Sequence, residues 1–142
     1  MPTTAEIAAQ ISEEFSLLEN WEEKYDYLIE KGQSLPDMPA DLKDNEHLVK
    51  GCQSSVWFAT ECREGRLYFQ TDSDSLIVKG LAALLHELLN GQPTDAFRDV
   101  DLSLFDTLGF WRHLSSQRSN GLTAMVNHLK SAALDCAARP GA

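Results

Sequence analysis

The apolar residues of this chain change their spacing at Val56, and that change limits the folds open to it. Between Ile7 and Leu18, apolar residues recur at the spacing of one helix face. Residues 56–62 and 67–71 are instead rich in strand-forming side chains, and an Arg-Glu-Gly-Arg connection lies between them. Two such runs joined by a short glycine-containing link predict an antiparallel hairpin.

Helices are predicted upstream of this hairpin. The first should begin after Thr3 or Thr4, because hydroxyl side chains are common at helix starts. A second helix should be capped by Asn20 and should stop at Gly32, since glycine often follows the last helical turn.

Helices are also predicted downstream. The four polar residues from Asp72 to Ser75 offer candidate helix caps, and Gly91 should end the helix that follows. Apolar residues over 122–133 predict a long C-terminal helix, and residues 48–49 are a candidate third strand. Helices on both sides of a hairpin are typical of an α+β fold, expected here as a single domain over residues 1–142.

The net charge argues against two classes of partner. The chain has 12 Lys and Arg against 22 Asp and Glu, a formal charge of −10. Nucleic acids and anionic membranes both attract clustered positive charge, so neither is expected as a partner. No apolar run approaches the ~18 residues of a membrane span, and the first residues lack the features of a signal peptide. We therefore expect a cytoplasmic protein.

Three cysteines are candidates for chemistry. Cys52, Cys62 and Cys136 form no CxxC pair, and their odd number predicts free thiols in a reducing compartment. Cys62 falls within a predicted strand and Cys136 within the last helix, so both are interpreted as packing residues.

Cys52 has a different setting. Gly51 precedes it and permits a tight or left-handed turn, while the polar residues 53–55 separate it from the hairpin. Lys50 would lower the pKa of the thiol, whereas the apolar neighbours would raise it. The pattern leaves two interpretations open: a reactive thiol on a loop, or a small buried hydrophobic residue.

Two charged residues outside this loop are further candidates. Asp74 should begin the helix that follows it, where a carboxylate caps backbone N–H groups. Arg118 should lie in the first turn of the C-terminal helix, where a cation gains nothing from the helix dipole. We therefore assign Arg118 to anchoring the cysteine loop or contacting a partner, with a solvated arginine as the alternative.

Four motifs carry a family resemblance. Residues 20–25, 49–57, 72–81 and 113–122 read NWEEKY, VKGCQSSVW, DSDSLIVKGL and HLSSQRSNGL. In this order and spacing, over about residues 15–130, they resemble the SufE/CsdE family of bacterial sulfur acceptors. The resemblance implies an α+β fold of the SufE/NifU-like kind, with helices packed against a small curved antiparallel sheet.

The resemblance also implies a function. In this family a pyridoxal-phosphate cysteine desulfurase, SufS- or CsdA-like, passes persulfide sulfur to a loop cysteine, which corresponds here to Cys52. The acceptor stimulates the desulfurase and delivers the sulfur to an iron–sulfur assembly scaffold. No cofactor or metal of its own is expected, because the pyridoxal phosphate belongs to the partner. Gly51, Gln53, Asp74 and Arg118 are the candidate loop or partner contacts.

Three other functions remain open from the residues. A cysteine hydrolase would need a histidine within hydrogen-bond reach of Cys52. An iron–sulfur scaffold would need Cys52, Cys62 and Cys136 as ligands, although cluster ligands are usually closely spaced. A binding module would not need the Cys52 thiol at all. The motifs fit the SUF and CSD branches equally well.

Overall fold

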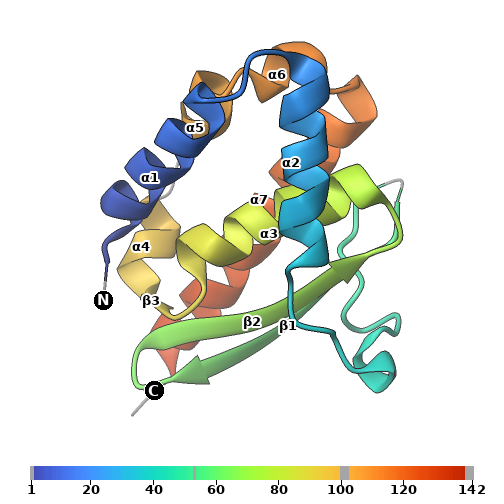
Figure 1. The fold of residues 1–142 in the computed structure, drawn as a ribbon. Helices are drawn as coiled ribbons and strands as arrows, with labels where there is room; N and C mark the ends of the chain where they lie inside the picture. Colours follow the sequence, from blue (N-terminus) through green and yellow to red (C-terminus); the bar gives the residue numbers. More distant parts are fainter. Residues whose placement is uncertain (1, 53, 100–102, 140–142) are drawn as a thin grey trace.

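The computed structural model describes residues 2–52, 54–99 and 103–139 and has an α+β architecture. A small antiparallel sheet has the strand order β1-β2-β3, and helices pack against it (Figure 1). Within these residues no helix combines the length and the apolar character needed to cross a membrane. The elements in chain order are α1 (Thr4–Ser16), α2 (Trp21–Gln33), a 3-10 turn (Ala40–Leu42), β1 (Val56–Arg63), β2 (Arg66–Ser73), α3 (Leu76–Leu89), β3 (Gln92–Pro93), α4 (Thr94–Asp99), α5 (Ser103–Thr107), α6 (Phe110–His113) and α7 (Ser116–Ala138).

The predicted hairpin is confirmed. β1 and β2 pair in register from Val56 opposite Ser73 to Arg63 opposite Arg66. Glu64 and Gly65, with φ of 52° and 76°, make the two-residue turn, and such left-handed pairs match the natural twist of a hairpin. The third strand is β3 rather than the expected residues 48–49, of which only Leu48 forms an isolated bridge.

One face of the hairpin is buried under helices. Phe58 on β1 contacts His128 of α7, while Phe69 on β2 contacts His86 of α3. The residues next to Phe58 and Phe69 in sequence point to the opposite face of the sheet and are less buried. This alternation is expected when helices cover only one face of a strand. α3 and α7 therefore form the layer directly on the sheet.

α2 crosses α3 at two glycines. A Cβ at Gly80 would lie 2.4 Å from the carbonyl oxygen of Leu28, and a Cβ at Gly32 would lie 3.0 Å from the nitrogen of Gly80. The expectation that Gly32 ends the helix is therefore wrong. Gly32 lies inside the last turn of α2, and Ser34 is the C-cap. The glycine at position 32 serves the close packing of α2 on α3 instead.

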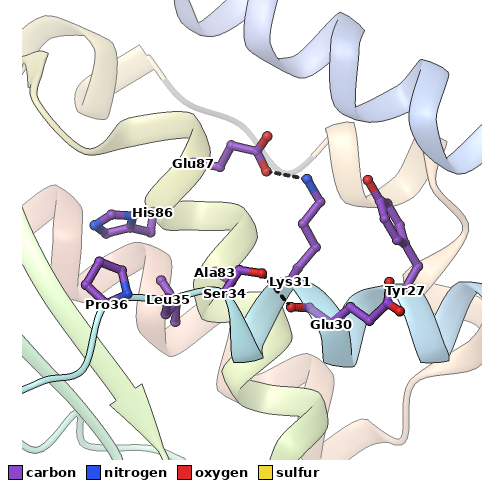
Figure 2. A pocket seen from close by; sticks show the side chains of 9 residues that line it. All are labelled: Tyr27, Glu30, Lys31, Ser34, Leu35, Pro36, Ala83, His86 and Glu87. Atoms are coloured by element: carbon purple, nitrogen blue, oxygen red, sulfur yellow. Dashed lines mark hydrogen bonds and ion pairs between the residues drawn. The ribbon is translucent and has the colours of Figure 1, made fainter.

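A partly buried cluster of charged side chains joins the three helices α1, α2 and α3. Lys31 of α2 pairs with Glu14 of α1 at 3.0 Å and with Glu87 of α3 at 2.9 Å. Burial alone would lower the pKa of Lys31, but the hydrogen bonds and charges of Glu87 and Glu14 outweigh it and raise the pKa. Figure 2 shows Lys31 reaching Glu87 across the cavity between α2 and α3.

Cys62 of β1 and Cys136 of α7 are joined by a disulfide, with their Cα atoms 5.6 Å apart. The expectation of free thiols at both positions is therefore wrong. The two residues are 74 positions apart, so no short motif could mark them as a pair. The argument for a reducing compartment took all three cysteines as free thiols, and two of them are paired.

Candidate functional site

Cys52 lies on a short loop that two hydrogen bonds close at its base. The Val49 N–H donates to the Val56 carbonyl at 2.7 Å, and the Phe58 N–H donates to the His47 carbonyl at 2.9 Å. Residues 50–52 and 54–55 therefore lie at the tip of an extended pair that continues from β1. A loop with a paired base holds its tip residues close to a rigid scaffold.

The backbone before Cys52 requires glycine. Gly51 has φ of +93°, a conformation that side chains other than glycine rarely adopt, which confirms the predicted left-handed turn. A Cβ at Gly51 would also lie 3.4 Å from the Cβ of Ala124 on α7. Gln53, the other loop candidate, lies outside the described residues.

The Cys52 thiol is half-buried against α7. Its Sγ donates a hydrogen bond to the carbonyl oxygen of Gly121 at 3.6 Å. A Cβ at Gly121 would lie 3.6 Å from the same sulfur, so this helix face leaves room for the thiol. Burial raises the pKa of the Cys52 thiol above its ordinary value. At rest, burial therefore favours the protonated thiol.

Asp74 braces the cysteine loop instead of capping α3. Its N–H donates to the Ser55 carbonyl at 3.2 Å, and its Oδ1 accepts from the Ser55 N–H at 3.1 Å. The cap of α3 is Ser75, whose hydroxyl accepts from the Val78 N–H at 3.4 Å. The predicted capping role of Asp74 is therefore wrong, because Ser55 takes up its carboxylate.

Asp72 forms a second brace nearby. Its carboxylate pairs with Lys43 and, at 3.2 Å, with Lys79 of α3. Burial would raise its pKa, but the two lysines and a backbone hydrogen bond from Ser73 lower it. The upstream connector and α3 are thereby held to the same end of β2.

A cavity of about 440 Å³ adjoins the thiol, between the N-terminal ends of α3 and α7. Arg118 lies in the first turn of α7, as predicted, and the structure brings it to this cavity together with Cys52 although the two are 66 residues apart. The residues that line it are Cys52, Ser54, Ser75, Val78, Ser115, Gln117, Arg118 and Gly121.

The sequence interpretation missed most of these lining residues. Ser75 and Ser115 are both helix caps, and Ser115 accepts from the Arg118 N–H at 3.2 Å. Serine ahead of an apolar periodic run is a signal for a cap. That signal could locate two helix starts, but it could not show that they share one cavity.

Two of the alternative functions find no support in this geometry. No histidine is among the residues that line the Cys52 cavity, so within the described chain a hydrolase lacks its base. Cys62 and Cys136 are bonded to each other, and Cys52 is the one free cysteine that the described residues contain. The three therefore do not form a set of cluster ligands. The cavity of Figure 2 is lined by α2, α3 and residues 34–36 and contains no cysteine.

Comparison with known proteins identifies the family. Residues 9–133 match the SufE family, described as an Fe-S metabolism associated domain. The chain is 39% identical over 129 residues to an uncharacterized SufE-like protein of Rhizobium meliloti, covering 87% of this chain and 92% of that one. A second uncharacterized SufE-like protein, from Rhizobium etli, is 36% identical over 129 residues, and the match covers 87% of this chain and 87% of that one.

A solved structure has the same fold. The solution structure of a hypothetical protein from Thermus thermophilus aligns with a TM-score of 0.78 over 94% of this chain and 97% of that chain. The two sequences are 21% identical, so this likeness concerns the fold. The sequence matches confirm the family that the four motifs resemble, and the solved structure agrees with the expected fold. The chain belongs to the SufE family, whose domain is associated with Fe-S metabolism.

Proposed function

We propose that this protein is a sulfur acceptor and carrier that takes persulfide sulfur onto Cys52 and passes it on for iron–sulfur cluster assembly. One observation carries the proposal. The free thiol that the described residues contain lies at the tip of a braced loop, beside a cavity large enough to admit another group. A family role in Fe-S metabolism supports this reading of the site.

The reaction is an exchange at sulfur. The Cys52 thiolate attacks the outer sulfur of a donor persulfide, the donor's sulfur–sulfur bond breaks, and the electron pair leaves on the donor cysteine. The proton lost by Cys52 is balanced by the proton that the released donor thiolate takes up. No net oxidation occurs, so the protein needs no cofactor of its own.

The resting geometry suits a carrier rather than an independent enzyme. A neutral, half-buried thiol is a poor nucleophile, which protects it from unwanted oxidants and electrophiles. Docking of the donor must release the thiol from Gly121 before attack. This coupling supports a role as partner and activator of a pyridoxal-phosphate cysteine desulfurase, SufS- or CsdA-like, with an iron–sulfur assembly scaffold as the receiver.

The setting that we propose is the cytoplasm. A relay through a free thiol needs a compartment that keeps Cys52 reduced. Structural disulfides of secreted proteins have potentials low enough to resist reduction by glutathione, and a Cys62–Cys136 bond of that kind would persist there.

Intact mass spectrometry tests the proposal. After incubation with a cysteine desulfurase and cysteine, the protein should gain the mass of one sulfur, about 32 Da, on the peptide that contains Cys52. Cys52→Ser should gain nothing, because a hydroxyl is not a nucleophile at neutral pH. The Cys62→Ser/Cys136→Ser double variant is the matched control and should gain the same mass as the wild type. Sulfur carried by Cys52→Ser would refute the proposal.

A further inference from the structure

The cavity beside Cys52 has a charge opposite to that of the protein. The chain carries 22 acidic and 12 basic side chains, yet the residues that line this cavity include Arg118 and no carboxylate. A neutral thiol does not need a cation beside it. The residues that line the cavity therefore fit a negatively charged group better than they fit the neutral Cys52 thiol.

Arg118 has no carboxylate partner among the described residues. Other cations of the described chain do pair with carboxylates: Lys31, Lys43, Lys79, Arg63 and Arg98. Arg118 also lies in the first turn of α7, where the positive end of the helix dipole disfavours a cation. Arg118 is exposed and solvent hydrates it at rest, so its charge is available to an anion in the cavity.

The backbone adds to the positive potential of this cavity. α3 and α7 have 14 and 23 residues, and the serine cap of each lies in the cavity wall. Helix N-termini carry partial positive charge from their N–H groups. These two ends reinforce the arginine but do not define a site without it.

The first sulfur of Cys52 does not use this potential. Its Sγ faces the carbonyl oxygen of Gly121, an acceptor that favours a protonated thiol. A second sulfur attached to Sγ would lie one bond farther out, about 2 Å away. The S–SH group is also a stronger acid than a thiol. In the persulfide form of Cys52, the negative charge is therefore expected on the outer sulfur.

We propose that the cavity is an anion pocket for the outer sulfur of a Cys52 persulfide, and that the guanidinium of Arg118 is its counter-ion. The inference rests on the proposed function, since it assigns a role in the loaded state. The bound persulfide gives its proton to solvent and stays as Cys52–S–S⁻. Arg118 thus keeps the carried sulfur ionised until a receiver arrives.

Other titratable groups on the surrounding elements are placed differently. None of them lines the cavity within the described chain: Lys50 on the loop, Asp74 after β2, Lys79 on α3, His113 on α6 and His128 on α7. Asp74 is engaged by Ser55, and Lys79 by Asp72. His113 stacks on Trp21, and His128 lies against Phe58. Of these charged groups, Arg118 is therefore the one that lines the cavity beside the sulfur.

The test loads sulfur chemically. Inorganic polysulfide converts the Cys52 thiolate to a persulfide and is itself shortened by one sulfur, and the excess is removed. The rate of alkylation of the persulfide by iodoacetamide is then followed by intact mass across pH. The inflection of this profile reports the ionisation of the outer sulfur.

Arg118→Gln should move this inflection upward by about one pH unit, the lower end of the effect of a neighbouring opposite charge. At a pH just below the inflection the rate should fall about tenfold. Arg118→Lys should stay close to the wild type, because it keeps the charge. Arg112→Gln removes another exposed arginine of the same region, outside the cavity, and should leave the profile unchanged.

Two results would overturn the inference: an unchanged inflection in Arg118→Gln, or an equal shift in Arg112→Gln. Melting temperatures verify that each variant is folded. Because no desulfurase is used, the measurement is independent of the proposed function. If a desulfurase fails to load Cys52, the proposed function fails while the pocket can still show the shift. If it loads Cys52 and the inflection does not move, only the counter-ion role fails.

Discussion

Asp74 and Ser55 bind each other twice, through the backbone of Asp74 at 3.2 Å and through its carboxylate at 3.1 Å. The hydroxyl of Ser73 adds a hydrogen bond to the Ser55 carbonyl at 2.9 Å. The end of the cysteine loop that enters β1 is therefore fixed to the end of β2. The start of the loop depends on Gly51 and on the thiol contact with Gly121.

Asp74→Ala should loosen the cysteine loop. It removes the carboxylate that accepts from the Ser55 N–H, which should lower the free energy of unfolding by about 1 kcal/mol. It should also raise the alkylation rate of Cys52 several-fold, because the thiol leaves α7 more often. Asn20→Ala, which removes the cap of α2, should cost about 0.5–2 kcal/mol without changing Cys52. Equal alkylation of Asp74→Ala and wild type would contradict the bracing role.

The reactivity of Cys52 should depend on pH in a predictable direction. Burial raises the pKa of the folded thiol, so its alkylation should inflect at a higher pH than in the protein unfolded by urea. The neutral thiol's contribution to stability is present below the unfolded pKa and is lost as pH rises through the folded pKa. Cys52→Ser should remove this alkaline loss. An inflection at or below that of the unfolded chain would show that the thiol is not buried.

Two helix glycines should respond oppositely to alanine. Gly80→Ala places a methyl group against the Leu28 carbonyl and should destabilise the protein by about 1–3 kcal/mol. Gly121→Ala meets only the Cys52 sulfur at an ordinary contact distance and should gain up to about 1 kcal/mol of helix propensity. Denaturant unfolding measures both. Changes of the same sign would mean that one of these helix contacts is misjudged.

Reduction of the Cys62–Cys136 disulfide should destabilise the protein. In the chain-entropy treatment, a link that spans 74 residues contributes about 4 kcal/mol. Unfolding in denaturant with and without reductant measures this, in the Cys52→Ser background. The Cys62→Ala/Cys136→Ala double variant should show no effect of reductant. If the unfolded, unreduced wild type exposes three reactive thiols, the disulfide does not form.

Local patterns predicted most of the helices and the hairpin. Asn20 is the cap of α2, and Thr3 is the cap of α1, because each side chain bonds a backbone N–H three residues ahead. The start of α7 at Ser116 follows from the same kind of signal. These features depend on residues close in the chain, which is why the sequence reveals them.

Features that depend on distant residues escaped prediction. Asp74 and Ser75 could each cap α3. Ser75 does so because the Asp74 carboxylate binds the N–H of Ser55, which is 19 residues away. The two residues of β3 are too few to show an alternating pattern. The same limit applies to the pairing of Cys62 with Cys136. The cavity beside Cys52 depends on how α3 and α7 pack, and no local pattern records that.

The paired base of the cysteine loop sets how far the thiol can travel. Cys52 is three residues from Val49, whose hydrogen bond to Val56 closes the base. A fully extended chain spans at most about 3.6 Å per residue, so the backbone of Cys52 can move no more than about 11 Å from that base while it holds. A donor whose sulfur sits deeper than this below its own surface is out of range. The proposed desulfurase must therefore hold its sulfur within this distance of the docked loop base, or the hydrogen bond between Val49 and Val56 must break before transfer.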